Sequence, residues 1–207
     1  MRGGSAGLIV SRETLLEGYF KDNPDKADRY AQILGTWGIE RGLIGPREGE
    51  RIWERHIANS LPLTTLIPEG VKVADIGSGA GLPGIVIALA RPDLEVVLIE
   101  PLQRRVDFLL EVIELLDLDI TVIRGKAESV KKSFEVVTAR AVAPLPKLLT
   151  ISWDLVKRDG ALLAIKGEGA QAEIDSTEAK KHSKTTLHTI ELPGFEISRV
   201  IEVRKTA

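Results

Sequence analysis

The 207-residue sequence contains no cysteine. This absence excludes disulfides, thiolate metal sites and a cysteine nucleophile, and no other metal site is expected. Long hydrophobic runs are also absent, since no stretch reaches the roughly 20 apolar residues that a membrane-spanning helix needs. Because the chain shows no secretory signal, we expect a cytoplasmic protein that does not contact a membrane. Aromatic residues make up only 4% of the chain, but the hydrophobic fraction of 43% is enough for a full core.

An excess of charge of one sign is missing as well, because the formal net charge is only −2 at pH 7. A dedicated nucleic-acid-binding module is usually strongly basic, so this value counts mildly against one. The charge is nevertheless uneven, since residues 121–184 carry 12 lysines and arginines against 8 acids. A polyanion is therefore expected to prefer the second half of the chain.

The first part of the chain has a helical pattern. Residues 1–10 are predicted to be a flexible tail, and residues 11–68 a helical cap that packs on the remainder. Ser11 can cap the first helix, Asn23-Pro24 is typical of the start of the second, and Pro62 is expected to end the third.

From residue 69 to residue 207, strand-like runs alternate with helical ones, which predicts a parallel sheet covered on both faces. The expected strands are Val71–Ile76, Glu95–Glu100, Ile120–Arg124, Phe134–Ala139 and Ala161–Lys166, and the expected helices are 83–90, 104–116, 146–155 and 171–181. Thr186–Leu192 and Ile197–Arg204 predict a closing antiparallel pair with a turn at Pro193-Gly194. We therefore predict an α/β, Rossmann-like domain of about seven mostly parallel strands, with an N-terminal helical extension.

A glycine-rich loop lies between the first expected strand and the next helix. Gly77, Gly79 and Gly81 permit positive φ and a close approach of the backbone to a ligand. In an open parallel sheet this crossover lies at the carboxyl ends of the strands, near the point where ligands bind. Glu100 ends the next strand, 19 residues after Gly81, and a carboxylate at this spacing can accept hydrogen bonds from both hydroxyls of a ribose.

Two cofactors fit this loop. Gly79-x-Gly81-x-x-Gly84 matches the dinucleotide fingerprint, so a nicotinamide-dependent oxidoreductase is one interpretation. Three features favour S-adenosylmethionine (SAM). A buried Asp75 would repel a pyrophosphate but can orient the loop and attract a methionine ammonium through water. The glycines alternate as in class I SAM-dependent methyltransferases, and residues 124–128 place a polar, acidic loop beside the expected adenine.

The sequence also restricts the acceptor. Methylation of cytosine C5 ordinarily uses a cysteine nucleophile, which this chain lacks. Amino methylation of adenine or cytosine usually has an Asn/Asp-Pro-Pro-aromatic tetrad after the fourth strand, where this chain has residues 138–144 without that tetrad. The acceptor is therefore expected to need neither a thiolate nor that amine-binding loop.

Five runs of the sequence carry a closer resemblance, and they are Arg55–Leu61, Asp75–Ile85, Arg104–Leu109, Ala139–Ala143 and Leu163–Gly167. In this order they resemble the bacterial 16S rRNA guanine-N7 methyltransferase family (RsmG, formerly glucose-inhibited division protein B, GidB). The resemblance covers nearly all of the chain beyond about Leu15. It departs at Asn59, where the family usually has Asp, and at Ala139, where it often has Ser. An Asn-Leu-Thr element that commonly precedes the helix containing His56 is also missing.

The resemblance implies SAM as methyl donor, S-adenosylhomocysteine as product and a guanine N7 in the decoding-region hairpin of 16S rRNA as acceptor. Loss of activity would confer low-level streptomycin resistance. The partner would be 16S rRNA or an assembling small ribosomal subunit, with no protein partner required. The residues that the resemblance assigns to the SAM pocket are Gly77, Leu82, Ala127, Glu128 and Arg140, and the class I pattern adds Asp75, Ser78, Gly79, Gly81 and Glu100.

Guanine N7 has a free lone pair, so no proton must leave and no general base is expected. Catalysis should come mainly from holding N7, the methyl carbon and sulfur in line. Arg140 is expected to position guanine O6, a phosphate or the SAM carboxylate, and His56 is interpreted as a helix-packing residue. The residues expected to bind RNA phosphates are Arg124, Lys126, Lys147 and Lys166.

Two further functions fit the same pattern. One is a small-molecule methyltransferase on the same fold, which a helical cap closing over the pocket would favour, whereas an open, basic mouth would favour RNA. The other is a non-enzymatic, SAM-sensing RNA-binding protein, which would bind both ligands without turnover.

Overall fold

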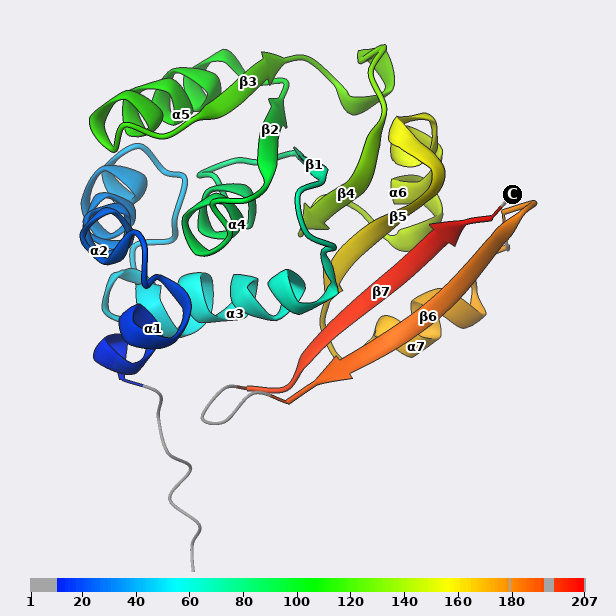
Figure 1. The fold of residues 1–207 in the computed structure, drawn as a ribbon, viewed down its shortest axis with the longest axis horizontal. Helices are drawn as coiled ribbons and strands as arrows, with labels where there is room; N and C mark the ends of the chain where they lie inside the picture. The colour runs from blue at the N-terminus through cyan, green and yellow to red at the C-terminus, as the bar shows by residue number, and fades with distance from the viewer. Residues whose placement is uncertain (1–10, 179, 192–195, 207) are drawn as a thin grey trace, which may run out of the picture.

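The computed structural model describes residues 11–178, 180–191 and 196–206. Its centre is a seven-stranded sheet in the order β3-β2-β1-β4-β5-β7-β6 (Figure 1). The strands are β1 (Lys72–Ile76), β2 (Glu95–Glu100), β3 (Ile120–Arg124), β4 (Phe134–Arg140), β5 (Val156–Lys166), β6 (Ser183–Ile190) and β7 (Ser198–Lys205). β1 to β5 are parallel, whereas β7 pairs antiparallel with both β5 and β6. The predicted α/β sheet is thus confirmed, while the tail at 1–10 and the turn at Pro193-Gly194 lie outside the described residues.

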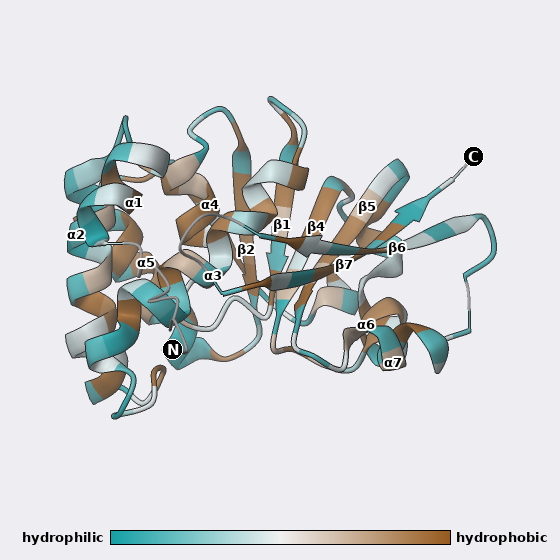
Figure 2. Cartoon of the chain, turned by 90° about the horizontal axis from the view of Figure 1, so that it is seen from below, coloured by the Kyte–Doolittle hydropathy of each residue, from teal (hydrophilic) through white to brown (hydrophobic). Residues whose placement is uncertain are grey.

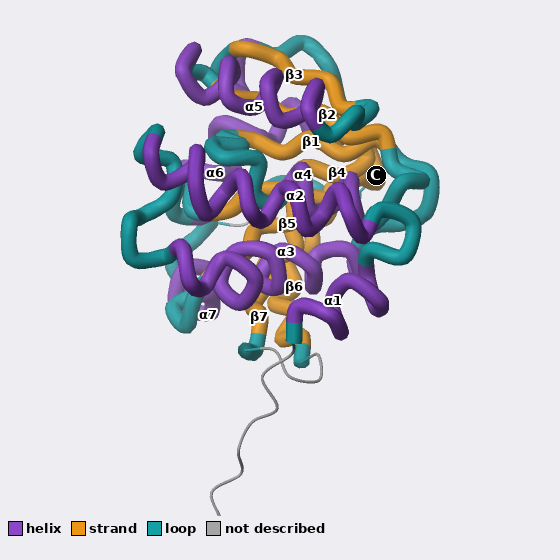
Figure 3. Tube along the Cα trace, turned by 90° about the vertical axis from the view of Figure 1, so that its left-hand side faces the viewer, coloured by secondary structure: helices purple, strands orange, loops and turns teal. Residues whose placement is uncertain are grey.

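Helices cover both faces of the sheet. The α-helices are α1 (Arg12–Tyr19), α2 (Pro24–Ile33), α3 (Ala58–Ser60), α4 (Gly84–Ala90), α5 (Gln103–Leu115), α6 (Leu145–Ser152) and α7 (Ala170–Asp175). The short 3₁₀ or π turns are η1 (Leu34–Gly38), η2 (Gly49–Arg51), η3 (Ile52–Ile57), η4 (Leu61–Leu66), η5 (Ala127–Ser129) and η6 (Trp153–Leu155). Figure 3 shows the α1, α2 and α3 region in front of the strands.

Alternate residues of each strand point to opposite faces, and this alternation gives two apolar cores. Val96 and Leu98 of β2 pack with residues of α1, α2, α4 and α5, whereas Val97 and Ile99 pack with residues of α6 and α7. Figure 2 shows the apolar central strands between these helical layers. Because the first core joins the N-terminal helices to β1 and β2, these helices are fixed relative to the carboxyl ends of the strands.

Several elements begin or end at residues other than those predicted, and β6, for example, covers Ser183–Ile190. Pro62 was expected to end the third helix, but the helical path continues as a 3₁₀ segment to Leu66. Proline stands in the first turn of that segment, where a backbone N–H has no helical partner to lose. β5 begins at Val156 rather than at Ala161, because its first residues pair with β4 across an irregularity in register.

The polar helix expected over 171–181 is shorter than predicted, because α7 covers only Ala170–Asp175. The hydroxyls of Ser176 and Thr177 both donate to the carbonyl of Glu173. Such local side-chain bonds compete with the backbone bonds that would continue a helix.

Gly84, the first residue of α4, packs tightly against β1 and β2. An added Cβ would lie 2.3 Å from Leu98 Cδ2 and 2.8 Å from Asp75 Oδ2. Gly84→Ala is therefore expected to lower the free energy of unfolding by about 1–3 kcal/mol, measured by urea denaturation. The control is Gly18→Ala in α1, where nothing lies within 4 Å of the added Cβ and a gain of about 0.5–1 kcal/mol is expected. Equal effects of the two changes would contradict the packing argument.

Candidate functional site

The glycine loop follows β1 at the carboxyl edge of the sheet. Gly77, Gly79 and Gly81 have φ values of 65°, 60° and 96°, so the positive φ expected from the sequence is confirmed. A Cβ at Gly81 would lie 2.4 Å from Ile85 Cδ1, and a Cβ at Gly77 would lie 2.9 Å from Val142 Cγ2. Only glycine therefore fits both the backbone conformation and the space at these two positions.

Glu100 ends β2 beside this loop, and its side chain is fully buried. Its Oε2 accepts a hydrogen bond from the Gly79 backbone N–H at 2.9 Å, and its Oε1 accepts one from the Leu102 N–H at 3.0 Å. Arg105 Nη1 lies 3.7 Å from the same carboxylate. The carboxylate thus fixes the central glycine of the loop, and each oxygen has a further lone pair for a ligand hydroxyl.

Asp75 lies in β1, two residues before the first glycine of the loop, and its side chain is fully buried. Its Oδ2 accepts a hydrogen bond from the Gly84 N–H at 3.2 Å, and its Oδ1 accepts one from the Thr138 hydroxyl at 3.2 Å. Burial raises the pKa of this carboxyl to about 7. These hydrogen bonds join Asp75 to the start of α4 and to β4, as the predicted loop-orienting role requires.

Tyr30 contacts the loop from outside it, and the sequence pattern did not reveal this contact. Its side chain comes from α2, is fully buried, and donates a hydrogen bond from Oη to the Ala80 carbonyl at 2.9 Å. The same oxygen would lie 3.0 Å from a Cβ at Gly81. In the sequence this tyrosine is one more apolar position of an amphipathic helix, and nothing there indicates a partner 50 residues away.

The other residues predicted for the cofactor pocket also lie along this edge. Ser78 is buried and donates its hydroxyl to the Asp75 carbonyl at 2.8 Å, and Leu82 is buried in the same loop. Ala127 is buried in η5, whereas Glu128 is exposed. η5 follows β3, the strand next to β2, so these residues flank Glu100. The structure therefore brings together the pocket residues contributed by β1, β2 and β3.

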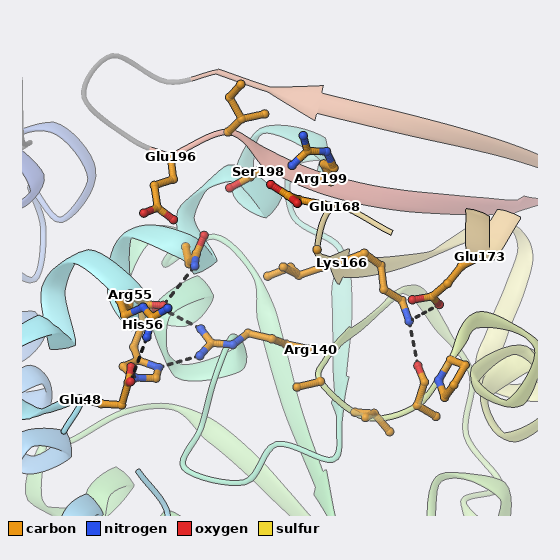
Figure 4. Close-up of a pocket in the computed structure, with 18 residues that line it drawn as sticks. Glu48, Arg55, His56, Arg140, Lys166, Glu168, Glu173, Glu196, Ser198 and Arg199 are labelled. Carbon is orange, nitrogen blue, oxygen red and sulfur yellow. Dashed lines mark hydrogen bonds and ion pairs between the residues drawn. The ribbon is translucent and has the colours of Figure 1, made fainter. Parts of the chain in front are cut away.

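A large cleft opens beside the loop at the ends of β4 and β5, and we call it the β4–β5 cleft (Figure 4). Its volume is about 1010 Å³, and its walls come from the carboxyl ends of β4 and β5, the start of β7 and the η3–α3 segment. Its charged residues are Arg55, Arg140, Lys166 and Arg199, with Glu48, Glu168, Glu173 and Glu196. The basic and acidic side chains are equal in number, so the cleft is not the basic mouth considered from the sequence.

Arg140 ends β4 and reaches across the cleft to the N-terminal helices. Its guanidinium donates to the His56 carbonyl at 3.2 Å and to Ser60 Oγ at 3.5 Å, and its Nη2 lies 2.6 Å from His56 Nδ1. On the other side of the ring, His56 Nε2 lies 3.3 Å from Glu48 Oε2. Burial, and then the positive charge of Arg140, lower the pKa of His56. His56 therefore does more than pack a helix, because it lines the cleft and contacts Arg140.

Lys166 ends β5, but it is already paired. Its Nζ donates to Glu173 Oε2 and to the Ala143 carbonyl, both at 2.8 Å, and Glu173 also accepts the Leu145 N–H at 2.8 Å. Lys166 and Glu173 thus hold the segment that connects β4 to α6. The three other residues expected to bind phosphates do not line the β4–β5 cleft. They are exposed, with Arg124 on β3, Lys126 in the loop after it and Lys147 on α6.

Within the described ranges, no helix is both long and apolar enough to cross a membrane. The same residues contain no group of three or more His, Cys, Asp or Glu side chains that could hold a metal ion.

The order of the parallel strands, the glycine loop after β1 and the buried acid ending β2 define a class I methyltransferase fold. Solved structures agree: the ribosomal protein L11 methylase from Lactobacillus delbrueckii subsp. bulgaricus has a TM-score of 0.57 at 17% identity, covering 71% of this chain and 77% of that one. The B. subtilis M1A22 tRNA methyltransferase TrmK has a TM-score of 0.58 at 17% identity, covering 74% and 66%. At this level of identity these likenesses concern the fold alone.

The chain belongs to the family rRNA small subunit methyltransferase G, whose model matches residues 23–197. It is 53% identical over 164 residues to the ribosomal RNA small subunit methyltransferase G of Mycobacterium sp. (strain JLS), covering 77% of this chain and 73% of that protein. The corresponding protein of Thermobifida fusca (strain YX) is 56% identical over 152 residues, covering 72% and 64%. The family predicted from the five sequence runs is confirmed, and the nicotinamide-dependent interpretation of the glycines is set aside.

Proposed function

We propose that this protein transfers a methyl group from SAM to N7 of a guanine in the decoding-region hairpin of 16S rRNA. The observation that carries the proposal is the family match over residues 23–197. The glycine loop and the β4–β5 cleft support it, because they lie at the same edge of the sheet, as a donor site and an acceptor site must. The substrate would be 16S rRNA or an assembling small subunit in the cytoplasm, and loss of activity would confer low-level streptomycin resistance.

The residues along the carboxyl edge fit SAM, which supplies an electrophilic methyl group on a sulfonium. The bare backbone at Gly79 allows a ligand to approach closely, since its φ is positive and an added Cβ would meet only the Gly77 carbonyl oxygen, at 3.8 Å. Glu100 presents a buried carboxylate that can accept ribose hydroxyls in addition to the two backbone N–H groups. Ala127 and Glu128 would flank the adenosine end. Ser78, Gly79, Leu82 and Asp75 would act through the shape of the loop.

The chemistry needs no proton acceptor on the protein. The N7 lone pair forms the new N–C bond, the methyl–sulfur bond breaks with its electron pair going to sulfur, and S-adenosylhomocysteine leaves. His56 does not need to act as a base, and its role is considered below. Arg140 would position guanine O6, a phosphate or the SAM carboxylate, so that N7 stays free and the three reacting atoms lie in line.

The balanced charge of the β4–β5 cleft suits a nucleobase better than a row of phosphates. A base edge presents both hydrogen-bond donors and acceptors, and matched cations and carboxylates can bind both. Arg124, Lys126 and Lys147, exposed outside the cleft, would then contact the RNA backbone, whereas Lys166 holds the protein's own loop. A volume of about 1010 Å³ is at the upper end of the ~300–1,000 Å³ typical of small-ligand pockets, which also leaves a small-molecule acceptor as the second candidate.

Mass mapping of 16S rRNA from cells that lack the gene tests the acceptor and its position together. We expect one N7-methylguanine to be missing and to return when the wild-type gene is restored. An unchanged modification pattern would reject the rRNA substrate and favour the small-molecule alternative. With purified protein, SAM but not NAD is expected to raise the melting temperature, and binding of SAM and RNA without turnover would indicate a sensor instead.

A further inference from the structure

The contact between His56 and Arg140 has a consequence for the proposed reaction. We infer that His56 is a positioning residue for Arg140, because its neutral ring holds the guanidinium in the direction required at the β4–β5 cleft. This inference rests on the proposed function and names the residue that prepares the cleft for its acceptor. The N-terminal helices would then position a side chain of the cleft, in addition to packing in the core.

The protonation state of the ring follows from its partners. Arginine has N–H donors and no acceptor, so His56 Nδ1 must accept the 2.6 Å hydrogen bond from Arg140 Nη2 and cannot carry a proton itself. In the neutral ring the proton is therefore on Nε2, which lies 3.3 Å from Glu48 Oε2. This second contact is electrostatic rather than an aligned hydrogen bond, but the carboxylate favours a proton on Nε2. Figure 4 shows Arg140 reaching toward the His56 ring, with Glu48 beside that ring.

The same histidine holds the guanidinium at two points. Its backbone carbonyl accepts from Nη1 at 3.2 Å while its ring accepts from Nη2, so both ends of the fork are bound to one residue 84 positions earlier in the chain. Two bonds from separate atoms fix the rotation of a planar group, whereas one bond does not. The remaining N–H groups of Arg140 are then available to a ligand in the cleft.

The surroundings of the His56 ring favour its neutral form. The charged side chains that face the ring of His56 are Glu48, Arg55 and Arg140. Glu48 pairs with Arg55 at 3.0 Å, so one carboxylate is shared between the ring and an exposed cation. Protonation of the ring would place a cation against Arg140 and remove the acceptor at Nδ1. Burial and the Arg140 charge keep the pKa of His56 below its ordinary value, so the ring stays neutral near pH 7.

Two substitutions of His56 distinguish the roles of its two ring nitrogens. Asparagine places an amide oxygen near the position of Nδ1 and keeps the acceptor, whereas glutamine places its amide near Nε2 and does not. We expect His56→Gln to lower the turnover of methyl transfer to 16S rRNA by about 100-fold, with SAM affinity changed less than about threefold. His56→Asn is expected to stay within about fivefold of wild type. Its activity should also lack the fall expected of the wild type when acid protonates the His56 ring, whose pKa lies below its ordinary value.

His188→Gln is the matched control, because His188 also pairs with a glutamate, Glu202 at 2.6 Å, but lies on β6 away from the cleft. It should leave the turnover unchanged. Arg140→Ala combined with His56→Gln should be no slower than Arg140→Ala alone, because the histidine acts through the arginine. Equal losses in the asparagine and glutamine variants, or losses that multiply in the double variant, would overturn the inference.

A titration by NMR tests the contact without any activity. The ring of His56 should titrate below its ordinary range in the wild type and shift upward in Arg140→Ala, because the positive charge of Arg140 lowers its pKa. An unshifted His56 would overturn the contact itself. Wild-type protein that does not methylate 16S rRNA, with the titration as expected, would instead reject the proposed function and leave the contact standing.

Discussion

Glu100→Gln is expected to weaken SAM binding by about 100-fold and leave the protein folded. The carboxylate is fully buried and already accepts the Gly79 and Leu102 N–H groups, so it holds the loop, and under the proposed function its remaining lone pairs would accept the ribose hydroxyls. Glutamine keeps one acceptor oxygen but places its N–H₂ group against one of the two backbone N–H donors. Both the hold on the loop and the binding of the ribose are therefore weakened. Hydrogen bonds to a charged group contribute about 1.5–3 kcal/mol, and a loss of that size gives roughly 10–100-fold in affinity. Isothermal titration with SAM measures it.

The control for this change is Glu128→Gln. Glu128 is the other acid predicted at the adenosine end, but it is exposed on η5, so its removal should alter SAM affinity by less than about fivefold. Urea unfolding of both variants separates loss of binding from loss of structure. If Glu128→Gln proved the more damaging change, or if Glu100→Gln bound SAM normally, the assignment of the ribose site to β2 would be wrong.

Asp75→Asn is expected to change how stability depends on pH. The folded pKa of Asp75 is about 7 and the ordinary value is 3.8, so between these values the folded protein keeps a proton that the unfolded chain has lost. The contribution of this carboxyl to the free energy of unfolding is therefore complete below about pH 4 and is lost as the pH rises to 7. At 1.36 kcal/mol per pH unit, the loss is at most about 4 kcal/mol. Asparagine removes the titration, and urea unfolding from pH 4 to pH 8 compares the two proteins.

Asp93→Asn is the control for the direction in which stability changes with pH. Arg91 lowers the pKa of Asp93 to about 2, so the folded protein loses this proton more readily than the unfolded chain. Its contribution is present above about pH 4 and is lost as the pH falls toward 2. The wild type and Asp93→Asn should therefore have parallel stability curves between pH 4 and pH 7. A parallel curve for Asp75→Asn as well would show that Asp75 is ionised in the folded protein.

The parts of the structure that the sequence predicted are those specified by local patterns. The predicted limits of β2, Glu95–Glu100, are correct, because a short and nearly continuous apolar run that ends in an acid is typical of a buried parallel strand. The positive φ of Gly77 and Gly81 followed from residue type and from their place between a strand and a helix. The family resemblance then supplied Arg140, whose place in the β4–β5 cleft no spacing rule would have indicated.

The parts that were missed depend on contacts between distant segments. Tyr30 reaches Ala80 and His56 reaches Arg140 only because the N-terminal helices pack against the carboxyl edge of the sheet. Lys166 has the pattern of a free cation at a strand end, and its pairing with Glu173 depends on where α7 begins. Such pairings are decided by packing in three dimensions, so residue order alone does not specify them.

The N-terminal helices contact both halves of the proposed reaction centre, since Tyr30 of α2 donates a hydrogen bond to the glycine loop and His56 of η3 contacts Arg140. Under the proposed function, the distance between donor and acceptor would therefore depend on the shape of one helical body, part of which also lines the β4–β5 cleft. Core substitutions in that body would change the alignment of the two substrates before they unfold the protein. Inactivating mutations should consequently be spread along residues 12–66 and not gather only around the loop.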